Sequence, residues 1–220
     1  MNDTASLHHD DAPTTPGPPS PTGPLTVGLI GAGKLGGVIG QLAAEAGHRL
    51  LVAERPADPT FDLVLSALLP SAHVVPLPEL LARADVVVLA VPQHTLTGLD
   101  LREAVGVVVD ATNAWGEGAE GVGPAWWEAR LPGVPVVKTL NHVAYTELLA
   151  DARPAGAPGR RALAVAGDDD AAVALAAHLV DSLGYDAVPV PASAAGLLEP
   201  EGALFGGRFD ADTMRAALGS

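Results

Sequence analysis

Runs of consecutive apolar residues alternate with helically spaced segments along the first half of the chain. The runs are short and continuously apolar, as is typical of strands buried on both faces, and cover 25–30, 49–54, 73–76, 85–92 and 105–110. The segments between them carry apolar residues every three or four positions and cover 34–47, 61–70 and 78–84. This alternation predicts an α/β fold, a Rossmann-type doubly wound parallel sheet with helices on both faces.

The second half continues the alternation less regularly. The predicted helices are 124–131 and 168–184, the predicted strands are 134–143, 162–167 and 185–190, and residues 196–218 read as partly helical. Asp168, Asp169 and Asp170 precede the clearest helix, where carboxylates are better explained as helix caps than as metal ligands. Residues 1–24 are rich in proline and poor in large apolar side chains, so a disordered tail is predicted there.

Composition narrows the classes of function. The 220 residues include 26 acidic and 12 basic side chains, which gives a formal net charge of −14. A field of that sign repels nucleic acid and anionic lipid. Cysteine is absent, so thiolate catalysis and cysteine-ligated metals are excluded. The sequence shows neither an export signal nor an apolar run long enough to span a bilayer, which predicts a soluble, cytoplasmic protein that binds small molecules.

The stretch TVGLIGAGKLGG (26–37) carries the chemistry, and it matches two phosphate-binding patterns. A triphosphate loop requires a hydroxyl residue directly after the lysine, to hold magnesium, but that residue is Leu35. The dinucleotide pattern G-x-G-x-x-G fits instead, with a strand before it and a helix after it. Its residues are Gly31, Ala32, Gly33, Lys34, Leu35 and Gly36.

The end of the second predicted strand holds two residues that favour different nucleotides. Glu54 is an acceptor for the ribose 2′-hydroxyl of NAD. Arg55, directly after it, suits the 2′-phosphate of NADP or stacks on adenine. The sequence leaves both nucleotides open.

Several stretches in order resemble one family. The chain is similar to the NADP oxidoreductases that depend on coenzyme F420 over roughly residues 25–200, in the stretches GLIGAGKLGG, DVVVLAVP, VVVDATN, VVKTLNHV, AGDD, LGYDAVPV and LLEP (197–200). The resemblance implies one domain over 25–220 with a small C-terminal α/β lobe from about residue 135. It also implies hydride transfer between NAD(P)H and coenzyme F420 or a similar flat acceptor, and a homodimer.

The same resemblance assigns further binding residues. The loop on the nicotinamide side falls on Val91, Pro92, Gln93 and His94, and the deazaflavin side falls on Leu140, Asn141, His142 and Val143. Asp110, Thr112 and Asn113 end a predicted parallel strand, so they are expected on the ligand side of the sheet. Direct hydride transfer needs no strong acid or base, and His142 is the candidate if one takes part.

Two departures from the family keep other functions open. Members that use NADP commonly have a small hydroxyl residue before the arginine, where this chain has Glu54. The segment EGALFGGRF (201–209) is glycine-rich where a more apolar helix is expected. The alternatives are a nucleotide-sensing protein without turnover and a small imine or keto-acid reductase, for which Lys138 is the one lysine besides Lys34.

Overall fold

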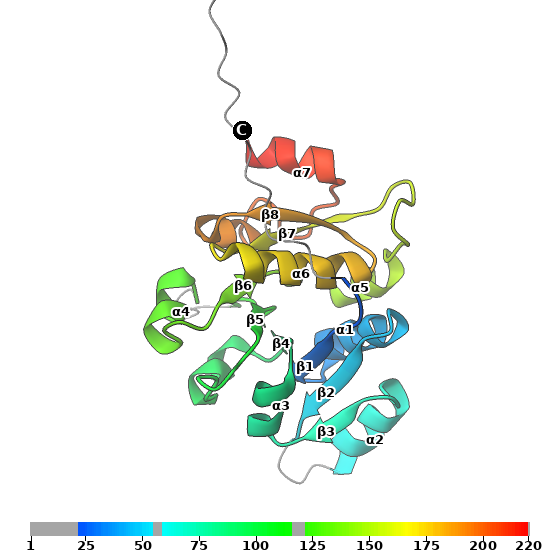
Figure 1. Ribbon diagram of the computed structural model, residues 1–220. Coiled ribbons are helices and arrows are strands. Elements are labelled where there is room, and N and C mark those ends of the chain that lie inside the picture. The colour runs from blue at the N-terminus through cyan, green and yellow to red at the C-terminus, as the bar shows by residue number, and fades with distance from the viewer. Residues whose placement is uncertain (1–21, 55–58, 116–121, 220) are drawn as a thin grey trace, which may run out of the picture.

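A computed structural model describes residues 22–54, 59–115 and 122–219. Its centre is one eight-stranded sheet in the order β3-β2-β1-β4-β5-β6-β7-β8 (Figure 1). The strands are β1 (Thr26–Ile30), β2 (Arg49–Ala53), β3 (His73–Val75), β4 (Val86–Leu89), β5 (Val107–Asp110), β6 (Val136–Lys138), β7 (Ala162–Ala166) and β8 (Asp186–Val190). The fold class predicted from the sequence is confirmed.

Helices cover both faces of the sheet, as the continuous apolarity of the strands requires. One face packs against α1 (Lys34–Glu45), α2 (Pro59–Leu68), α5 (Tyr145–Ala150) and α6 (Asp170–Ser182). The other face packs against α3 (Leu77–Arg83), the 3₁₀ segment η1 (Gln93–Gly98) and α4 (Pro124–Arg130). None of the described helices is long and apolar enough to span a membrane.

The predicted parallel sheet has one antiparallel junction. Strands β1 to β6 are parallel, but β7 joins β6 antiparallel through the pair Lys138 and Ala166, and β8 runs parallel to β7. The chain between β6 and β7 makes only the short helix α5 and a long loop, so β7 does not return to the starting edge as a crossover strand would. Two predicted boundaries also shift: β4 ends at Leu89, not at Pro92, and the second helix ends at Leu68, two residues before Pro70.

The C-terminal part adds its own small core to the end of this sheet. The 3₁₀ segment η2 (Ala192–Leu198) and helix α7 (Ala211–Leu218) cover β7 and β8, with Leu198, Leu204 and Met214 buried between them. Most of the predicted disordered tail, residues 1–21, lies outside the described residues. The predicted division into a Rossmann domain and a lobe from residue 135 stays a prediction.

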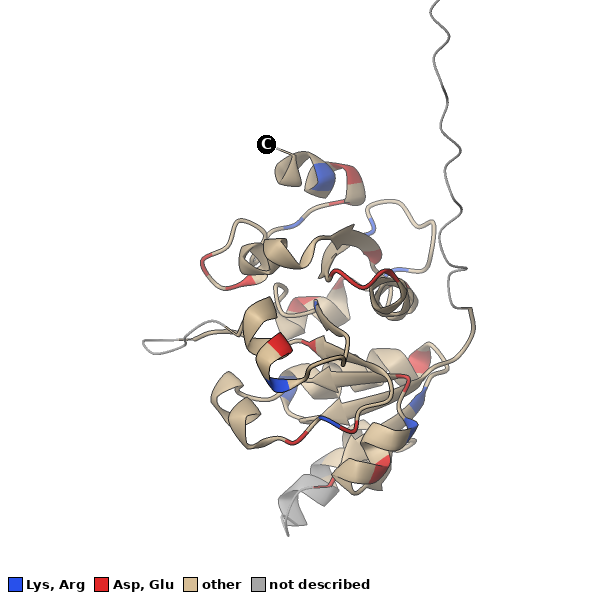
Figure 2. Ribbon diagram, turned by 60° about the vertical axis from the view of Figure 1, so that its left-hand side comes forward, with Lys and Arg blue, Asp and Glu red and all other residues tan. Residues whose placement is uncertain are grey.

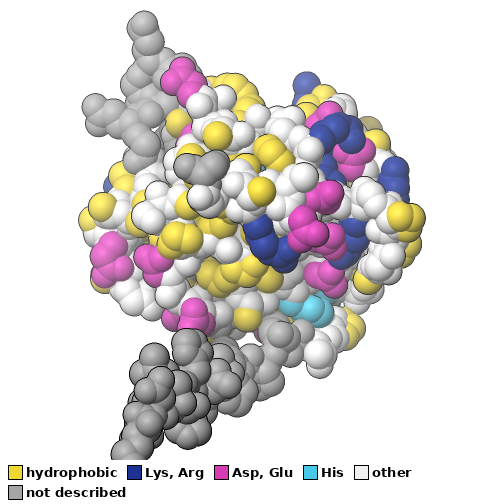
Figure 3. Space-filling view, turned by 90° about the horizontal axis from the view of Figure 1, so that it is seen from above, with side chains coloured by type: hydrophobic (Ala, Val, Ile, Leu, Met, Phe, Trp, Pro, Cys, Tyr) yellow, Lys and Arg dark blue, Asp and Glu magenta, His cyan; other side chains and the backbone are white. Residues whose placement is uncertain are grey.

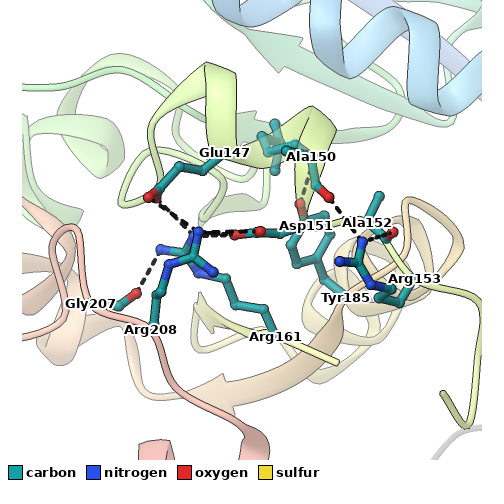
Figure 4. A network of polar contacts seen from close by, with 10 residues as sticks. Glu147, Ala150, Asp151, Ala152, Arg153, Arg161, Tyr185, Gly207 and Arg208 are labelled. Carbon is teal, nitrogen blue, oxygen red and sulfur yellow. Dashed lines mark hydrogen bonds and ion pairs between the residues drawn. The ribbon is translucent and has the colours of Figure 1, made fainter. Parts of the chain in front are cut away.

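An arginine network fastens α5 to β7 and to the strand-like segment before α7 (Figure 4). The buried guanidinium of Arg161 donates to Glu147 and Asp151, at 2.9 Å each, and to the carbonyl of Gly207. Arg208 pairs with the same two carboxylates from the solvent side. Helix α5, which this network holds, contacts α1, the helix that follows the glycine turn.

Candidate functional site

Strands β1 and β4 lie side by side, but their connections leave the sheet in opposite directions. The carboxyl ends of such a pair form the usual ligand site of a doubly wound sheet. Gly31 ends β1 there with φ +99°, a conformation that favours glycine. A Cβ on Gly31 would lie 2.5 Å from the carbonyl oxygen of Ala90, after β4, so this glycine is required for packing.

The other two glycines of the motif differ from each other. A Cβ on Gly36 would lie 1.8 Å from the carbonyl oxygen of Gly31, so the helix can approach the strand only with glycine there. A Cβ on Gly33 would meet nothing within 4 Å, and its φ of −74° is open to any residue. Neither packing nor backbone conformation therefore explains Gly33, and the free space beside it suits a ligand that approaches the backbone.

Helix α1 begins at this free space without a side-chain cap or an acidic residue in its first turn. The amide groups of a first helical turn lack partners within the helix and carry partial positive charge, so they bind phosphate groups. Lys34 adds a full charge, and its ammonium lies 5.6 Å from the ring centroid of Tyr145 on α5. These groups fit the pyrophosphate of a dinucleotide.

Glu54 follows β2 on the same edge of the sheet. Its amide donates to the carbonyl of Val75, and its side chain is exposed. Arg55, the competing residue, lies outside the described residues. The geometry therefore places the carboxylate at the end of β2, on the edge that carries the glycine turn, and the choice between the two nucleotides stays open.

The loop after β4 brings the predicted nicotinamide-side residues to the switch point. A Cβ on Gly31 would lie 2.7 Å from Val91, which shows how closely the two loops pack. Pro92 precedes η1, and His94 in η1 is exposed. The Nε2 atom of Gln93 is buried and makes no hydrogen bond to the described residues, so it is a donor without a partner at this edge.

The loop after β6 is the most constrained part of the edge. Leu140 has φ +66°, and it is the one non-glycine residue with positive φ in the part of the chain that the structure describes. Such strain is held only where the surroundings fix it. Asn141 supplies that fixation, because its amide nitrogen donates to Asn113 Oδ1 at 2.9 Å and to the carbonyl of Leu198 at 2.7 Å. Asn113 donates back to the carbonyl of Asn141, which joins the loops after β5 and β6.

His142 is buried beside this pair. Its Nε2 accepts from the amide of Ala164, so the proton of the neutral ring is on Nδ1, which has no partner among the described residues. Burial, and then the charges of Arg161 and Lys138, lower the pKa of His142 to about 3. The ring is therefore neutral near pH 7 and does not act as an imidazolium acid. Val143, the next residue, is buried in the larger hydrophobic core.

Asp110 corrects the sequence-based prediction of a ligand-facing carboxylate. It is fully buried on the α4 side, where its Oδ2 accepts from the indole of Trp127 and from Lys138, each at 3.3 Å. The Lys138 ammonium also donates to the carbonyl of Thr112 and lies 2.9 Å from Glu199. Thr112 itself donates to Asp110 Oδ1.

Sequence reasoning missed Glu199 as the partner of Lys138 and of the Ala114 amide, which donates to it at 3.0 Å. The only signal was the LLEP stretch of the family resemblance, since nothing local connects residues 85 positions apart. The three side chains Asp110, Lys138 and Glu199 tie the end of η2 to β5 and β6.

Of the three aspartates at the start of α6, Asp169 caps this helix, Asp168 binds the start of η2, and Asp170 lies in the first turn of α6. Asp169 Oδ1 accepts from the amide of Ala172 at 2.8 Å, and Asp168 accepts from the amide of Ala192. Within the described ranges, no group of three or more His, Asp or Glu is arranged to hold a metal ion.

Charges elsewhere on the molecule are mixed. The Asp and Glu positions are scattered along the ribbon (Figure 2), and on the face seen from the α7 end the Lys and Arg side chains lie beside Asp and Glu side chains (Figure 3). A nucleic-acid surface requires basic groups gathered on one face. The visible arrangement offers no such concentration among the described residues.

A comparison with known protein families matches the part of the chain that forms most of this edge of the sheet. Residues 26–114 match the family described as NADP oxidoreductase, coenzyme F420-dependent. That range contains the glycine turn, Glu54 and the loops after β4 and β5. The resemblance inferred from the sequence is confirmed over this range. No curated protein matches the chain at a significant level.

Solved structures repeat the whole fold. The hypothetical protein SMa0349 of Sinorhizobium meliloti is 26% identical, with a TM-score of 0.70 over 84% of this chain and 95% of that one. A protein of Arthrobacter sp. FB24, provisionally described as an F420-dependent NADP reductase, is 23% identical, with a TM-score of 0.63 over 89% and 96%. An imine reductase of Myxococcus stipitatus in complex with NAD+ is 17% identical (TM-score 0.56), and this chain spans 59% of it.

Proposed function

We propose that the chain transfers hydride between NAD(P)H and coenzyme F420 or a similar flat acceptor. The observation that carries this proposal is Gly33, a glycine that neither packing nor backbone conformation requires. It lies at the uncapped start of a twelve-residue helix, between two glycines that packing does require. A dinucleotide pyrophosphate bound to the helix amides accounts for Gly33, the one glycine of the three that packing leaves unexplained.

The residues of this edge have separate tasks in the proposed reaction. Gly31 to Gly36 and Lys34 bind the pyrophosphate, and Glu54 and Arg55 receive the adenosine ribose. Val91, Pro92, Gln93 and His94 lie on the nicotinamide side, while Asn141, His142 and Val143 lie on the acceptor side. The nicotinamide, when bound, supplies or receives the hydride.

The protein contributes position and exclusion of water more than proton transfer. The strained Leu140 and the reciprocal Asn113–Asn141 pair fix the loops on the acceptor side. Gln93 Nε2, Asn141 Oδ1 and His142 Nδ1 are buried polar atoms without partners among the described residues, which suits groups that bind a polar ring edge. Two activated rings held at a fixed distance need no further acid or base.

A small imine or keto-acid reductase is less well supported. Such a reaction needs a proton donor at the substrate. Lys138, the one lysine besides Lys34, is buried in contact with Asp110 and Glu199. The chain also spans only about 60% of the pyrroline-5-carboxylate reductase of Streptococcus pyogenes and of the imine reductase to which it is similar.

The test is the substitution Gly33→Val. Since a side chain at Gly33 enters free space, the fold should survive, while the pyrophosphate loses its approach to the backbone. We expect NADPH affinity to fall by at least about 100-fold, on the order of 3 kcal/mol, as measured by titration of nicotinamide fluorescence. Gly98→Val is the matched control, because a Cβ on Gly98 also meets nothing within 4 Å.

An unchanged NADPH affinity in Gly33→Val would contradict the nucleotide site. The acceptor is tested in the wild type by mixing NADPH with oxidised F420 and following the absorbance of both cofactors. Coupled loss of both signals supports the proposed reaction, and tight nucleotide binding without any loss favours the sensor. Sedimentation of the same sample tests the homodimer that the resemblance implies.

A further inference from the structure

Two aromatic rings that belong to none of the buried cores lie together on the acceptor side. Trp115 follows β5 and is 68% exposed, which is high for the largest apolar side chain. Phe205 comes from the segment after η2, and the two ring centroids are 5.6 Å apart at an interplanar angle of 81°. Neither ring is part of the three hydrophobic clusters of the described residues, so core packing does not explain them.

A backbone amide next to each ring is fixed by a hydrogen bond, one to Glu199 and one to His142 of the predicted acceptor site. The amide of Ala114, next to Trp115, donates to Glu199 at 3.0 Å. The amide of Gly206, next to Phe205, donates to the carbonyl of His142 at 2.9 Å. Trp115 is also two residues from Asn113, whose side chain is joined to Asn141. Each ring is therefore within two residues, along the chain, of a residue that is hydrogen-bonded to the loop after β6.

The geometry of the pair suits a flat conjugated ring. Edge-to-face packing holds the indole through its contact with Phe205 and leaves most of its surface open to solvent. An exposed aromatic face is a stacking platform for heteroaromatic rings, since dispersion and quadrupole attraction act on any flat partner. The glycines on both sides of the Phe205 segment, Gly202 and Gly206, give this loop the backbone freedom to place an aromatic ring where the family resemblance implies a helix.

We propose that Trp115 and Phe205 form an aromatic wall that stacks against the ring of the hydride acceptor. This inference rests on the proposed function and specifies its acceptor as a large planar ring of the deazaflavin or flavin class. A small keto acid or imine would gain little from such a wall. The segment 201–209, which departs from the family pattern, then determines acceptor binding in this chain.

The experiment compares Trp115→Leu, Trp115→Phe and Phe205→Leu with Trp126→Phe. Trp126 lies on α4 beside Arg130 and is assigned no binding task, so Trp126→Phe is the matched control. Steady-state rates are measured with NADPH against F420, each varied in turn. We expect Trp115→Leu to raise the KM for F420 by about tenfold, as loss of one stacking partner does, with the KM for NADPH within about twofold. Trp115→Phe should restore most of the affinity, since it keeps a ring.

A binding measurement without turnover separates the two proposals. Quenching of tryptophan fluorescence by F420 alone should occur in wild type and Trp126→Phe and be weakened in Trp115→Leu, with thermal melting as the check on folding. If wild type binds NADPH and the KM for F420 is unchanged in Trp115→Leu, the aromatic wall is overturned and the proposed function stands. If wild type binds NADPH but not F420, the wall is overturned together with the acceptor. If Trp115→Leu instead dissociates a dimer, the pair is a subunit contact and the wall is overturned.

Discussion

Two polar regions, the arginine network on α5 and the carboxyl edge of the sheet, differ in how their buried side chains are satisfied. In the arginine network, Arg161 donates to two carboxylates and a carbonyl, so its charge is compensated within the protein, although its Nε makes no hydrogen bond to the described residues. At the carboxyl edge of the sheet, Gln93, Asn141 and His142 each keep a buried atom without a partner among the described residues. Compensated groups stabilise the fold, whereas uncompensated ones cost stability and are retained where a ligand completes them.

The largest expected difference between the two regions is in their response to acid. The pKa of His142 is lowered to about 3, mainly by burial, against an ordinary value near 6.5. Between these values the unfolded chain binds more protons than the folded one, so stability is full above pH 6.5 and falls as the pH drops toward 3. The loss is roughly 1.4 kcal/mol for each pH unit in that window, on the order of 5 kcal/mol in all.

Urea unfolding at pH 7, 6, 5 and 4 measures this slope, and His142→Gln should flatten it. His48 contributes in the same direction, because burial and then His178 lower its pKa as well. His48→Gln is therefore the parallel control, and the slope that His142→Gln removes belongs to His142. An identical slope in wild type and His142→Gln would show that the ring is not buried as neutral imidazole.

The sequence predicted the strands and helices of the first half well, because each continuous apolar run belongs to a strand buried on both faces. The glycine turn was also predicted, because the residues of that motif follow one another in the sequence. It missed α5, whose six residues carry too few apolar positions to show a period. The antiparallel β7 was also missed, because strand direction depends on how the long connection packs and not on the strand's own residues.

Some features of the candidate site could likewise be predicted from the sequence, and others could not. The residues that follow β1 could be named from the glycine motif, and those that follow β4 and β6 from the family resemblance. The pairing of Asn113 with Asn141, the capture of Lys138 by Asp110 and Glu199, and the contact of Trp115 with Phe205 could not. Each joins residues 28 to 90 positions apart, and no periodicity carries that information.

Breaking the compensated region should give the next largest effect. Arg161→Ala leaves the half-buried Glu147 and Asp151 with only Arg208, so we expect a loss of about 3 kcal/mol in the free energy of unfolding. Arg215→Ala is the control, because its pair with Asp212 is exposed and contributes about 0.5 kcal/mol or less. Both values come from urea unfolding at pH 7. Equal losses in the two variants would mean that the network is no more than a surface ion pair.

The smallest expected effect is at the carboxyl edge of the sheet and concerns nucleotide preference. Glu54 is exposed, and its side chain makes no hydrogen bond or ion pair with the described residues, so its charge acts on whatever binds beside it. A carboxylate there accepts from a ribose 2′-hydroxyl but repels a 2′-phosphate. Glu54→Ser should therefore raise the ratio of kcat/KM for NADPH over NADH by about fivefold, since removal of one unit charge near a phosphate is worth about 1 kcal/mol in water.

Glu103→Gln, an exposed acid remote from the glycine turn in sequence, is the control for the change in overall charge. The effect of Glu54→Ser should shrink as salt is added, because an exposed charge acts through screened solvent. A ratio that does not move, or that moves equally in Glu103→Gln, would mean that Glu54 does not face the adenosine ribose. Nucleotide preference would then depend on Arg55, and Arg55→Ala would be expected to lower the same ratio.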